Sequence, residues 1–270
     1  MVDLMSTSSP FDPMPFEVVG PDVSSIVTED DAPVDNIYSE KQQRLLTEPL
    51  YSGWEGPPLD ESGEARPFVA MANVGLFTTT HQPPTVPDVL VSLDVTVHDD
   101  VHIKEHRTYF VWEFGKVPDV VIEVVSNREG GELTDRKRRY RQMRVTHYVV
   151  WDPEQHLGEA KLQVFELRGQ IYSRVERPWF QGLGLGLVEW KGEYERLTDT
   201  WLRWCDAKGE VIPTGAERAM SERARAETEK ARAETEKVRA EAEKARAESE
   251  KARAERLAEK LRALGIDPDA

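Results

Sequence analysis

The hydrophobic pattern changes along the chain, and the first change separates an N-terminal arm from a helix. The first 36 residues are rich in Pro, Ser and Asp and show no sustained apolar period, so they are predicted to form a flexible acidic arm. Residues 38–48 then have the composition of a short helix that Pro49 would end. Ser39 is the candidate N-cap, and Glu40 lies in the first turn, where the helix dipole favours an acid.

Short β-rich segments follow from residue 66 onward. Residues 86–97 (VPDVLVSLDVTV) alternate between an apolar face and a mixed face that includes Asp88, which is the period of a strand. Residues 118–126 (PDVVIEVVS) are apolar on both faces, as in a strand buried on both sides of a sheet. Glu123 lies inside this run, and a charge in such a place needs a partner or a metal ion.

The second half of the predicted domain continues with helix and strand in alternation. Two glycines at 130–131 precede a helical segment at 132–144, and HYVVW at 147–151 reads as the next strand. Residues 162–175 are expected to form a hairpin. The order strand, glycine turn, helix, strand predicts an α/β fold with a mixed central sheet flanked by helices.

Glycine alternates with leucine at residues 182–187, and this run has two interpretations. A phosphate-binding loop would require Lys-Ser or Lys-Thr directly afterwards, and neither follows. A strand with glycine on one face is therefore favoured. Trp190, Trp201 and Trp204 are expected to close the core rather than to stack on bases, because large aromatic side chains mostly supply buried area.

The C-terminal segment is a charged repeat. Residues 217–264 are almost wholly Ala, Glu, Lys and Arg and repeat every seven residues, which predicts a long helix. A coiled-coil seam would consist of small side chains such as Ala224 and Thr228, which bury little area. A lone exposed helix is favoured over a homodimer, and both stay open. The predicted organisation is an arm at 1–36, a domain at 37–212 and a helix at 213–270.

The charge is distributed unevenly. The formal net charge is -15; the first 35 residues hold eight acids and no base, residues 217–270 are neutral, and residues 36–216 carry -7. This is not the profile of a protein that binds duplex nucleic acid through bulk electrostatics. A nucleic-acid substrate would therefore depend on a local basic patch or on bound cations.

Two further features limit the class of protein. The single cysteine, Cys205, excludes an intrachain disulfide and a multi-cysteine zinc site, and it is expected to be a buried small side chain. No apolar run approaches the ~18 residues that span a bilayer, and the N-terminus has acids where a secretory signal has basic residues. A cytoplasmic protein is expected.

Three residues could together carry chemistry: Asp88, Glu123 and Lys137. Carboxylates on neighbouring strands can hold a divalent cation, which lowers the pKa of a bound water and stabilises charge on a phosphodiester. A nearby lysine would orient that water or help to deprotonate it. The same residue types also occur as ordinary strand-start and helix-surface residues, so spacing alone leaves a purely structural role open for each.

Other polar residues are weaker candidates. Asp119 shares a strand face with Glu123, but four strand residues separate them by about 13 Å, so both cannot readily bind one ion. Glu40 is a candidate extra acid, or an ordinary first-turn residue. Three histidines at spacings of four are more typical of a surface loop than of a metal site: His98, His102 and His106.

The ordered string of these motifs resembles the Uma-two family of restriction-endonuclease-like proteins. The resemblance runs from VPDVLVSLDV through PDVVIEVVSNREGGE and the following helix to HYVVWDP, and covers roughly residues 36–205. It implies a PD-(D/E)XK fold, one or two Mg²⁺ ions (with Mn²⁺ as an alternative) and DNA phosphodiester hydrolysis.

The resemblance also implies roles for the three residues. Asp88 matches the first metal carboxylate, and Glu123 matches the acid of the second motif. The lysine usually found two positions later is absent, because position 125 is valine. Within the family the lysine is moved to the following helix, and Lys137 is the position that fits.

Two hypotheses from different classes follow. One is a Mg²⁺-dependent endodeoxyribonuclease that uses Asp88, Glu123 and Lys137. The other is a catalytically inactive nuclease-fold module that binds or assembles through its C-terminal helix, suggested by the acidic domain and the long tail.

Overall fold

The computed structural model describes residues 21–24, 26, 36–126 and 131–263, apart from the side chain of residue 261. The chain divides into two compact units, Met1–Ile212 and Pro213–Ala270. The predicted acidic arm lies mostly outside the described residues. Within its described part, Val23 is buried and Ile26 packs beside it, against Phe77 and Phe110.

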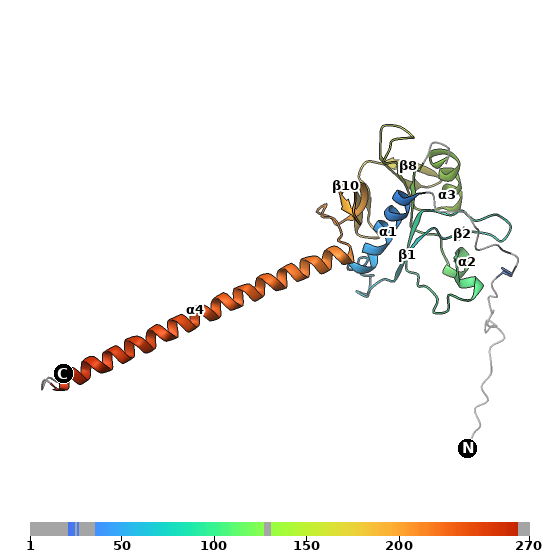
Figure 1. Ribbon diagram of the computed structural model, residues 1–270. Coiled ribbons are helices and arrows are strands. Elements are labelled where there is room, and N and C mark those ends of the chain that lie inside the picture. Colours follow the sequence, from blue (N-terminus) through green and yellow to red (C-terminus); the bar gives the residue numbers. More distant parts are fainter. Residues whose placement is uncertain (1–20, 25, 27–35, 127–130, 264–270) are drawn as a thin grey trace, which may run out of the picture. The chain divides into compact units, whose positions relative to one another are not determined.

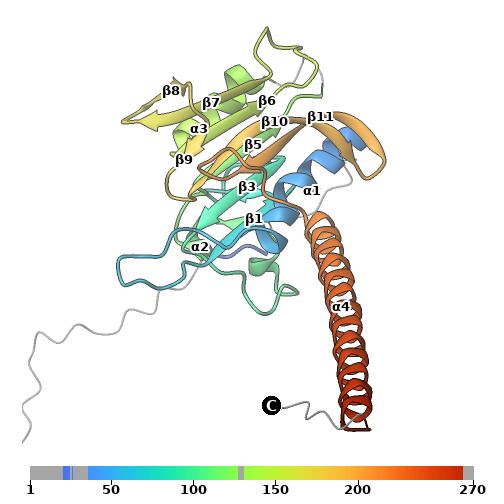
Figure 2. The same ribbon diagram turned by 90° about the vertical axis from the view of Figure 1, so that its left-hand side faces the viewer.

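The first unit is built around a six-stranded mixed sheet. Its strand order is β1-β3-β5-β6-β7-β8, where β5 and β6 are parallel and every other neighbouring pair is antiparallel. The parallel pair requires a crossover, which contains helix α3 (Lys137–Met143), as Figure 2 shows. The strands are β1 (Phe68–Ala72), β3 (Val89–Leu93), β5 (Val120–Val124), β6 (His147–Trp151), β7 (Leu162–Arg168) and β8 (Ile171–Val175).

One face of this sheet packs against helix α1 (Ile37–Ser52) and a second sheet, of order β11-β10-β9. Strand residues Val91, Ile122 and Val149 point to this side and meet Leu46 of α1 and Trp204. The second sheet consists of β9 (Trp179–Phe180), β10 (Leu185–Tyr194) and β11 (Leu197–Cys205).

The other face is covered by α3 and by a parallel two-stranded pair. Val121 and Val150 point to this side and pack with Tyr140 of α3. All five residues of β5 are buried, so the prediction of a strand covered on both faces is confirmed, as is the hairpin β7–β8. The remaining elements are β2 (Leu76–Phe77), β4 (Tyr109–Phe110), α2 (Val111–Phe114) and a single 3-10 turn (Lys104–His106).

Helix α1 differs from the prediction at both ends. Its N-cap is Asn36, whose side chain accepts the backbone N–H of Ser39, so Ser39 is inside the helix. Pro49 is inside the last turn. The helix continues past it because Leu50 is buried in the core, and burial of a leucine offsets the hydrogen bond that proline removes.

The Gly-Leu run is a turn followed by a strand. Residues 181–184 form the turn after β9, and β10 begins at Leu185, so the prediction of one continuous strand over 182–187 is wrong in its first half. Gly184 has φ +67, in the left-handed region, and a Cβ there would lie 3.0 Å from Pro58. Trp201 and Trp204 are fully buried, as expected, whereas Trp190 is only half-buried.

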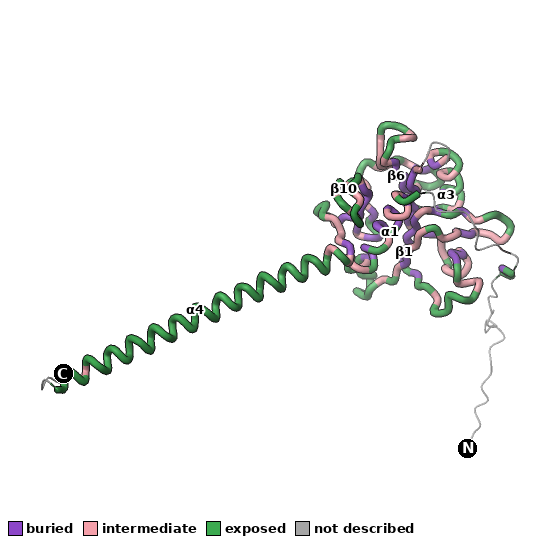
Figure 3. The backbone as a smooth tube through the Cα atoms, viewed as in Figure 1, coloured by how far each residue is buried: buried purple, intermediate pink, exposed green. Residues whose placement is uncertain are grey.

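The second unit is one helix, α4 (Gly215–Ala263), of 49 residues (Figure 1). Thr214 and Glu217 form a capping box, in which the hydroxyl of Thr214 accepts the N–H of Glu217 and the carboxylate of Glu217 accepts the N–H of Thr214. Almost all described residues of α4 are exposed, in contrast to the central strands (Figure 3). No helix in the described part of the chain is long and apolar enough to cross a membrane.

Candidate active site

Asp88, which directly precedes β3, lies opposite Glu123 on the neighbouring strand β5. Strands β3 and β5 are antiparallel and pair Val89 with Ile122. The same register, extended by one residue, places Asp88 opposite Glu123, and such side chains have Cβ atoms roughly 4.5–5.5 Å apart. The structure therefore brings together the two acids that the sequence placed on neighbouring strands.

The carboxylate of Asp88 is held by two hydrogen bonds. Nε2 of Gln43, on α1, donates to Oδ1 at 2.8 Å, and the backbone N–H of Val124 donates to Oδ2 at 2.7 Å. Gln43 is itself oriented by Asn73, whose Nδ2 donates to its side-chain oxygen at 2.8 Å. Each Asp88 oxygen keeps a second acceptor position, because an ionised carboxylate has about four lone-pair sites.

Glu123 is more deeply buried, with 1% of its surface exposed. Nη1 of Arg136 donates to Oε2 at 2.5 Å, and the hydroxyl of Tyr140 donates to Oε1 at 2.5 Å. The charge inside the apolar strand is therefore paired and hydrogen-bonded, which is the condition under which burial of a carboxylate is tolerated.

The segment after β5 explains why Arg136 and Tyr140 both reach Glu123. Gly131 has φ +66, where a side chain would be strained, and it starts a short π-helical turn over Glu132–Arg136. Arg136 and Tyr140 are four residues apart at the start of α3 and so lie on one face. The Arg136 side chain is 39% exposed, so its guanidinium spans from buried Glu123 to solvent.

Burial raises the pKa of both acids. The pKa of Glu123 is raised well above its usual value by desolvation and by the charge of Asp88, although Arg136 and the Tyr140 hydroxyl oppose the shift. Burial also raises the pKa of Asp88, against the opposing hydrogen bonds from Val124 and Gln43. The pair thus favours a shared positive charge, whether a proton or a cation.

A third buried acid, Glu132, acts on Arg136 through its charge. It is 6% exposed, and among the described residues its Oε2 atom has no hydrogen-bond partner. Desolvation lowers the pKa of Arg136. The charges of Glu123, Asp88 and Glu132 raise it, and the pKa is raised overall. The backbone oxygen of Glu132 accepts the hydroxyl of Tyr148.

Lys137 is not where the sequence argument required it. Its ammonium lies 3.3 Å from the centre of the Phe165 ring, and no described contact joins it to Asp88 or Glu123. Successive residues of a helix point about 100° apart, so when Arg136 faces the acids Lys137 cannot. Desolvation, and then Arg174, lowers the pKa of Lys137. The expectation that these three residues share one pocket is wrong for Lys137, and Arg136 occupies the place predicted for it.

The two secondary candidates also lie apart from the pair. Glu40 forms an exposed ion pair with Arg44, one turn along α1. Asp119 accepts the backbone N–H of Leu93 at 2.8 Å and the ammonium of Lys116 at 2.7 Å. Both have contacts that fit the structural roles weighed for them from the sequence, a first-turn acid and a strand-start residue.

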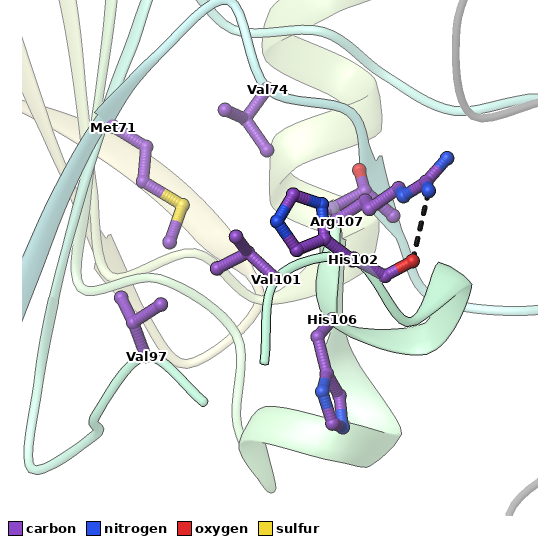
Figure 4. A pocket seen from close by; sticks show the side chains of 8 residues that line it. Met71, Val74, Val97, Val101, His102, His106 and Arg107 are labelled. Carbon is purple, nitrogen blue, oxygen red and sulfur yellow. Dashed lines mark hydrogen bonds between the residues drawn. The ribbon is translucent and has the colours of Figure 1, made fainter. Parts of the chain in front are cut away.

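His102 and His106 line a separate pocket of about 610 Å³ (Figure 4), and His98 lies beside His106. The rings of His98 and His106 are stacked, with centroids 3.9 Å apart, and Nδ1 of His106 is 2.7 Å from the backbone oxygen of Asp100. Arg107 donates to the backbone oxygen of His102. In the part of the chain that the structure describes, no group of three or more His, Cys, Asp or Glu side chains could hold a metal ion.

Residues that the sequence argument missed complete the site. Gln43 could be noticed only through its contact with Asp88, because a glutamine in a helix has no distinctive pattern. Arg136 and Tyr140 do carry a signal, since a base and a tyrosine four residues apart after a strand with an internal acid can share one partner. This spacing is visible in the sequence, but whether Arg136 or Lys137 faces the acids depends on how α3 packs against the sheet.

Comparison with known proteins gives the family of the chain. No curated protein sequence matches the chain. A family model described as "Putative restriction endonuclease" matches residues 28–187, which include all of α1, β3, β5 and α3. The mixed central sheet with its flanking helices is consistent with the restriction-endonuclease-like fold. The chain therefore belongs to the Uma2 (Uma-two) family of restriction-endonuclease-like proteins.

Proposed function

We propose that this protein is a Mg²⁺-dependent DNA endonuclease that hydrolyses phosphodiester bonds, with Mn²⁺ as an alternative ion. The observation that carries the proposal is the buried pair Asp88 and Glu123, with the Arg136 guanidinium beside it and open to solvent. Membership of a nuclease-like family gives the reaction class.

The donor set fits a hard divalent cation. Mg²⁺ prefers carboxylate oxygens and usually takes one or two carboxylates together with water and substrate phosphate. Asp88 and Glu123 supply such oxygens, each already oriented by hydrogen bonds. When bound, the cation would lower the pKa of a water and stabilise negative charge on the phosphate.

Arg136 has a role that differs from that of the lysine expected from the resemblance. A guanidinium stays protonated at any physiological pH, so Arg136 cannot accept a proton from water. It can fix the orientation of Glu123 and stabilise the charge that develops on a phosphate, because its planar donors match both groups. The Tyr140 hydroxyl donates to the other oxygen of Glu123 and thereby helps to fix the orientation of that carboxylate.

The experiment is nicking of supercoiled DNA by the full chain with Mg²⁺. Glu123→Gln and Arg136→Gln are expected to lower the rate by at least ~100-fold, since each removes charge at the reacting centre. Arg136→Lys keeps the charge and is expected to retain more activity than Arg136→Gln. Exposed Lys191→Gln is the matched control for loss of one positive charge.

The contrary result is equally clear. Equal rates in the wild type and in Glu123→Gln would remove the catalytic assignment. Absence of any cleavage, together with no calorimetric binding of Mg²⁺ at millimolar concentration, would favour the inactive binding or assembly module.

A further inference from the structure

Helix α3 carries a concentration of positive charge in an otherwise acidic unit. Residues 136–144 include six Lys or Arg and no acid, although residues 36–216 as a whole carry -7. Arg136 points inward to Glu123, whereas Arg138, Arg139 and Arg141 are exposed. The local basic patch that a nucleic-acid substrate would need is thus present, on the helix that completes the acid site.

This exposed face of α3 forms one wall of a groove of about 700 Å³. Arg138, Arg139, Gln142 and Met143 come from α3, and five of the other lining residues come from the segment between β2 and β3. Among the described residues that line the groove there is neither a carboxylate nor an aromatic ring: Thr78, Thr79, Gln82, Pro83, Thr85, Val111, Val117, Arg138, Arg139, Gln142 and Met143. The polar lining consists of guanidinium, hydroxyl and amide groups.

We propose that this groove binds the phosphodiester backbone of double-stranded DNA without reading its sequence. Guanidinium groups bind phosphate oxygens in a bidentate manner, and threonine and glutamine side chains are common additional phosphate donors. Single-stranded nucleic acid is usually held by aromatic rings on which bases stack, and the described lining offers none. The proposal rests on the proposed function, because it names the surface that would deliver DNA to that site.

The charge of the patch acts locally. At physiological ionic strength the screening length is about 8 Å, so acids farther away contribute little repulsion to a phosphate in the groove. Arg138 forms a pair with Asp135 at 3.1 Å, but both side chains are more than 60% exposed, and such pairs contribute little. Its guanidinium can therefore turn to a phosphate at small cost.

The test is fluorescence anisotropy with a short labelled duplex of mixed sequence, in EDTA, over a range of salt concentrations. The double variant Arg138→Gln with Arg139→Gln is expected to reduce the slope of log K against log salt by roughly 2. Binding at 0.1 M salt is expected to weaken on the order of 60-fold. Lys191→Gln with Lys208→Gln removes the same charge from exposed positions outside the groove and is expected to bind like the wild type.

Each contrary result overturns the inference. The groove is not the binding surface if both double variants weaken binding equally, or if neither does, or if the wild type does not bind at low salt. A single strand of equal length that binds more tightly than the duplex overturns the assignment to double-stranded DNA. Because no divalent cation is present, binding is measured independently of hydrolysis, so failure of the nicking experiment leaves this result interpretable.

Discussion

Replacing Glu123 by Gln should stabilise the metal-free protein while abolishing its activity. Glutamine has nearly the same shape, and its amide oxygen can accept from Tyr140 or Arg136. Its NH₂ group would face Asp88 and donate to that carboxylate, so an attraction would replace a repulsion. The substitution also removes the cost of keeping a charge in a site that is only 1% exposed.

The size of the expected stabilisation follows from the repulsion that the substitution removes and the ion pair that it loses. If the carboxylates are separated by about the 5 Å expected between facing Cβ atoms, they repel by roughly 3 kcal/mol at an effective dielectric constant of 20. The lost ion pair with Arg136 offsets much of this, but the Arg136 side chain is 39% exposed, so the pair is partly screened by solvent. The pKa of Glu123 is raised overall, which shows that the surroundings disfavour its charged form. We expect a net stabilisation of about 1–3 kcal/mol, or roughly 3–8 °C in Tm for a unit of this size.

The direction of the pKa shift determines how the stability difference between the variant and the wild type changes with pH. The folded-state pKa of Glu123 lies above its unfolded value of about 4.3. The neutral carboxyl therefore contributes stability that is fully present below about pH 4.3 and is lost as the pH rises through the folded-state pKa. The glutamine of the Glu123→Gln variant does not titrate, so the advantage of the variant should be near zero at about pH 4 and should grow toward about pH 8.

The assay is chemical denaturation in EDTA at several pH values, with exposed Glu193→Gln as the matched control, expected to change stability by less than about 0.5 kcal/mol. Added Mg²⁺ at ten times its Kd should stabilise the wild type by about 1.4 kcal/mol and Glu123→Gln much less. A variant that is less stable than the wild type at pH 8 without metal would refute this account of the acid pair.

Three further results are expected. Tyr140→Phe should destabilise the protein by about 1.5–3 kcal/mol at pH 8, and Tyr148→Phe should destabilise it less. The reason is that the Tyr140 hydroxyl donates to the carboxylate of Glu123, whereas the Tyr148 hydroxyl donates to a backbone oxygen. Equal losses of stability in chemical denaturation would contradict this. Lys137→Ala should lower the nicking rate far less than loss of Arg136 does, and an equal loss would restore the lysine to the site. Sedimentation of the full chain should give a monomer at all concentrations tested, since α4 exposes small side chains at its seam; a dimer would show that the heptads associate.

The order of elements could be predicted because each segment carries its own period. The alternation at residues 86–97 and the unbroken apolar run around Glu123 identified two strands, and the heptads identified α4, since these patterns depend only on local geometry. The ends of α1 were less predictable. Whether the helix continues through Pro49 depends on the burial of Leu50, which is a property of the packed core.

The candidate active site was likewise predictable only in part from the sequence. The sequence by itself determined that Glu123 is a charge inside an apolar strand. It also placed Asp88 in a strand at residues 86–97, whereas β3 begins one residue later, at Val89. Only the tertiary structure decided that the two acids face each other, because the register of β3 and β5 is fixed by packing, and that Gln43 and Asn73 hold Asp88. The tertiary structure also decided that Arg136, and not Lys137, faces the two acids. One residue of difference rotates a side chain by about 100°, and only the docking of α3 against the sheet sets which residue faces the acids.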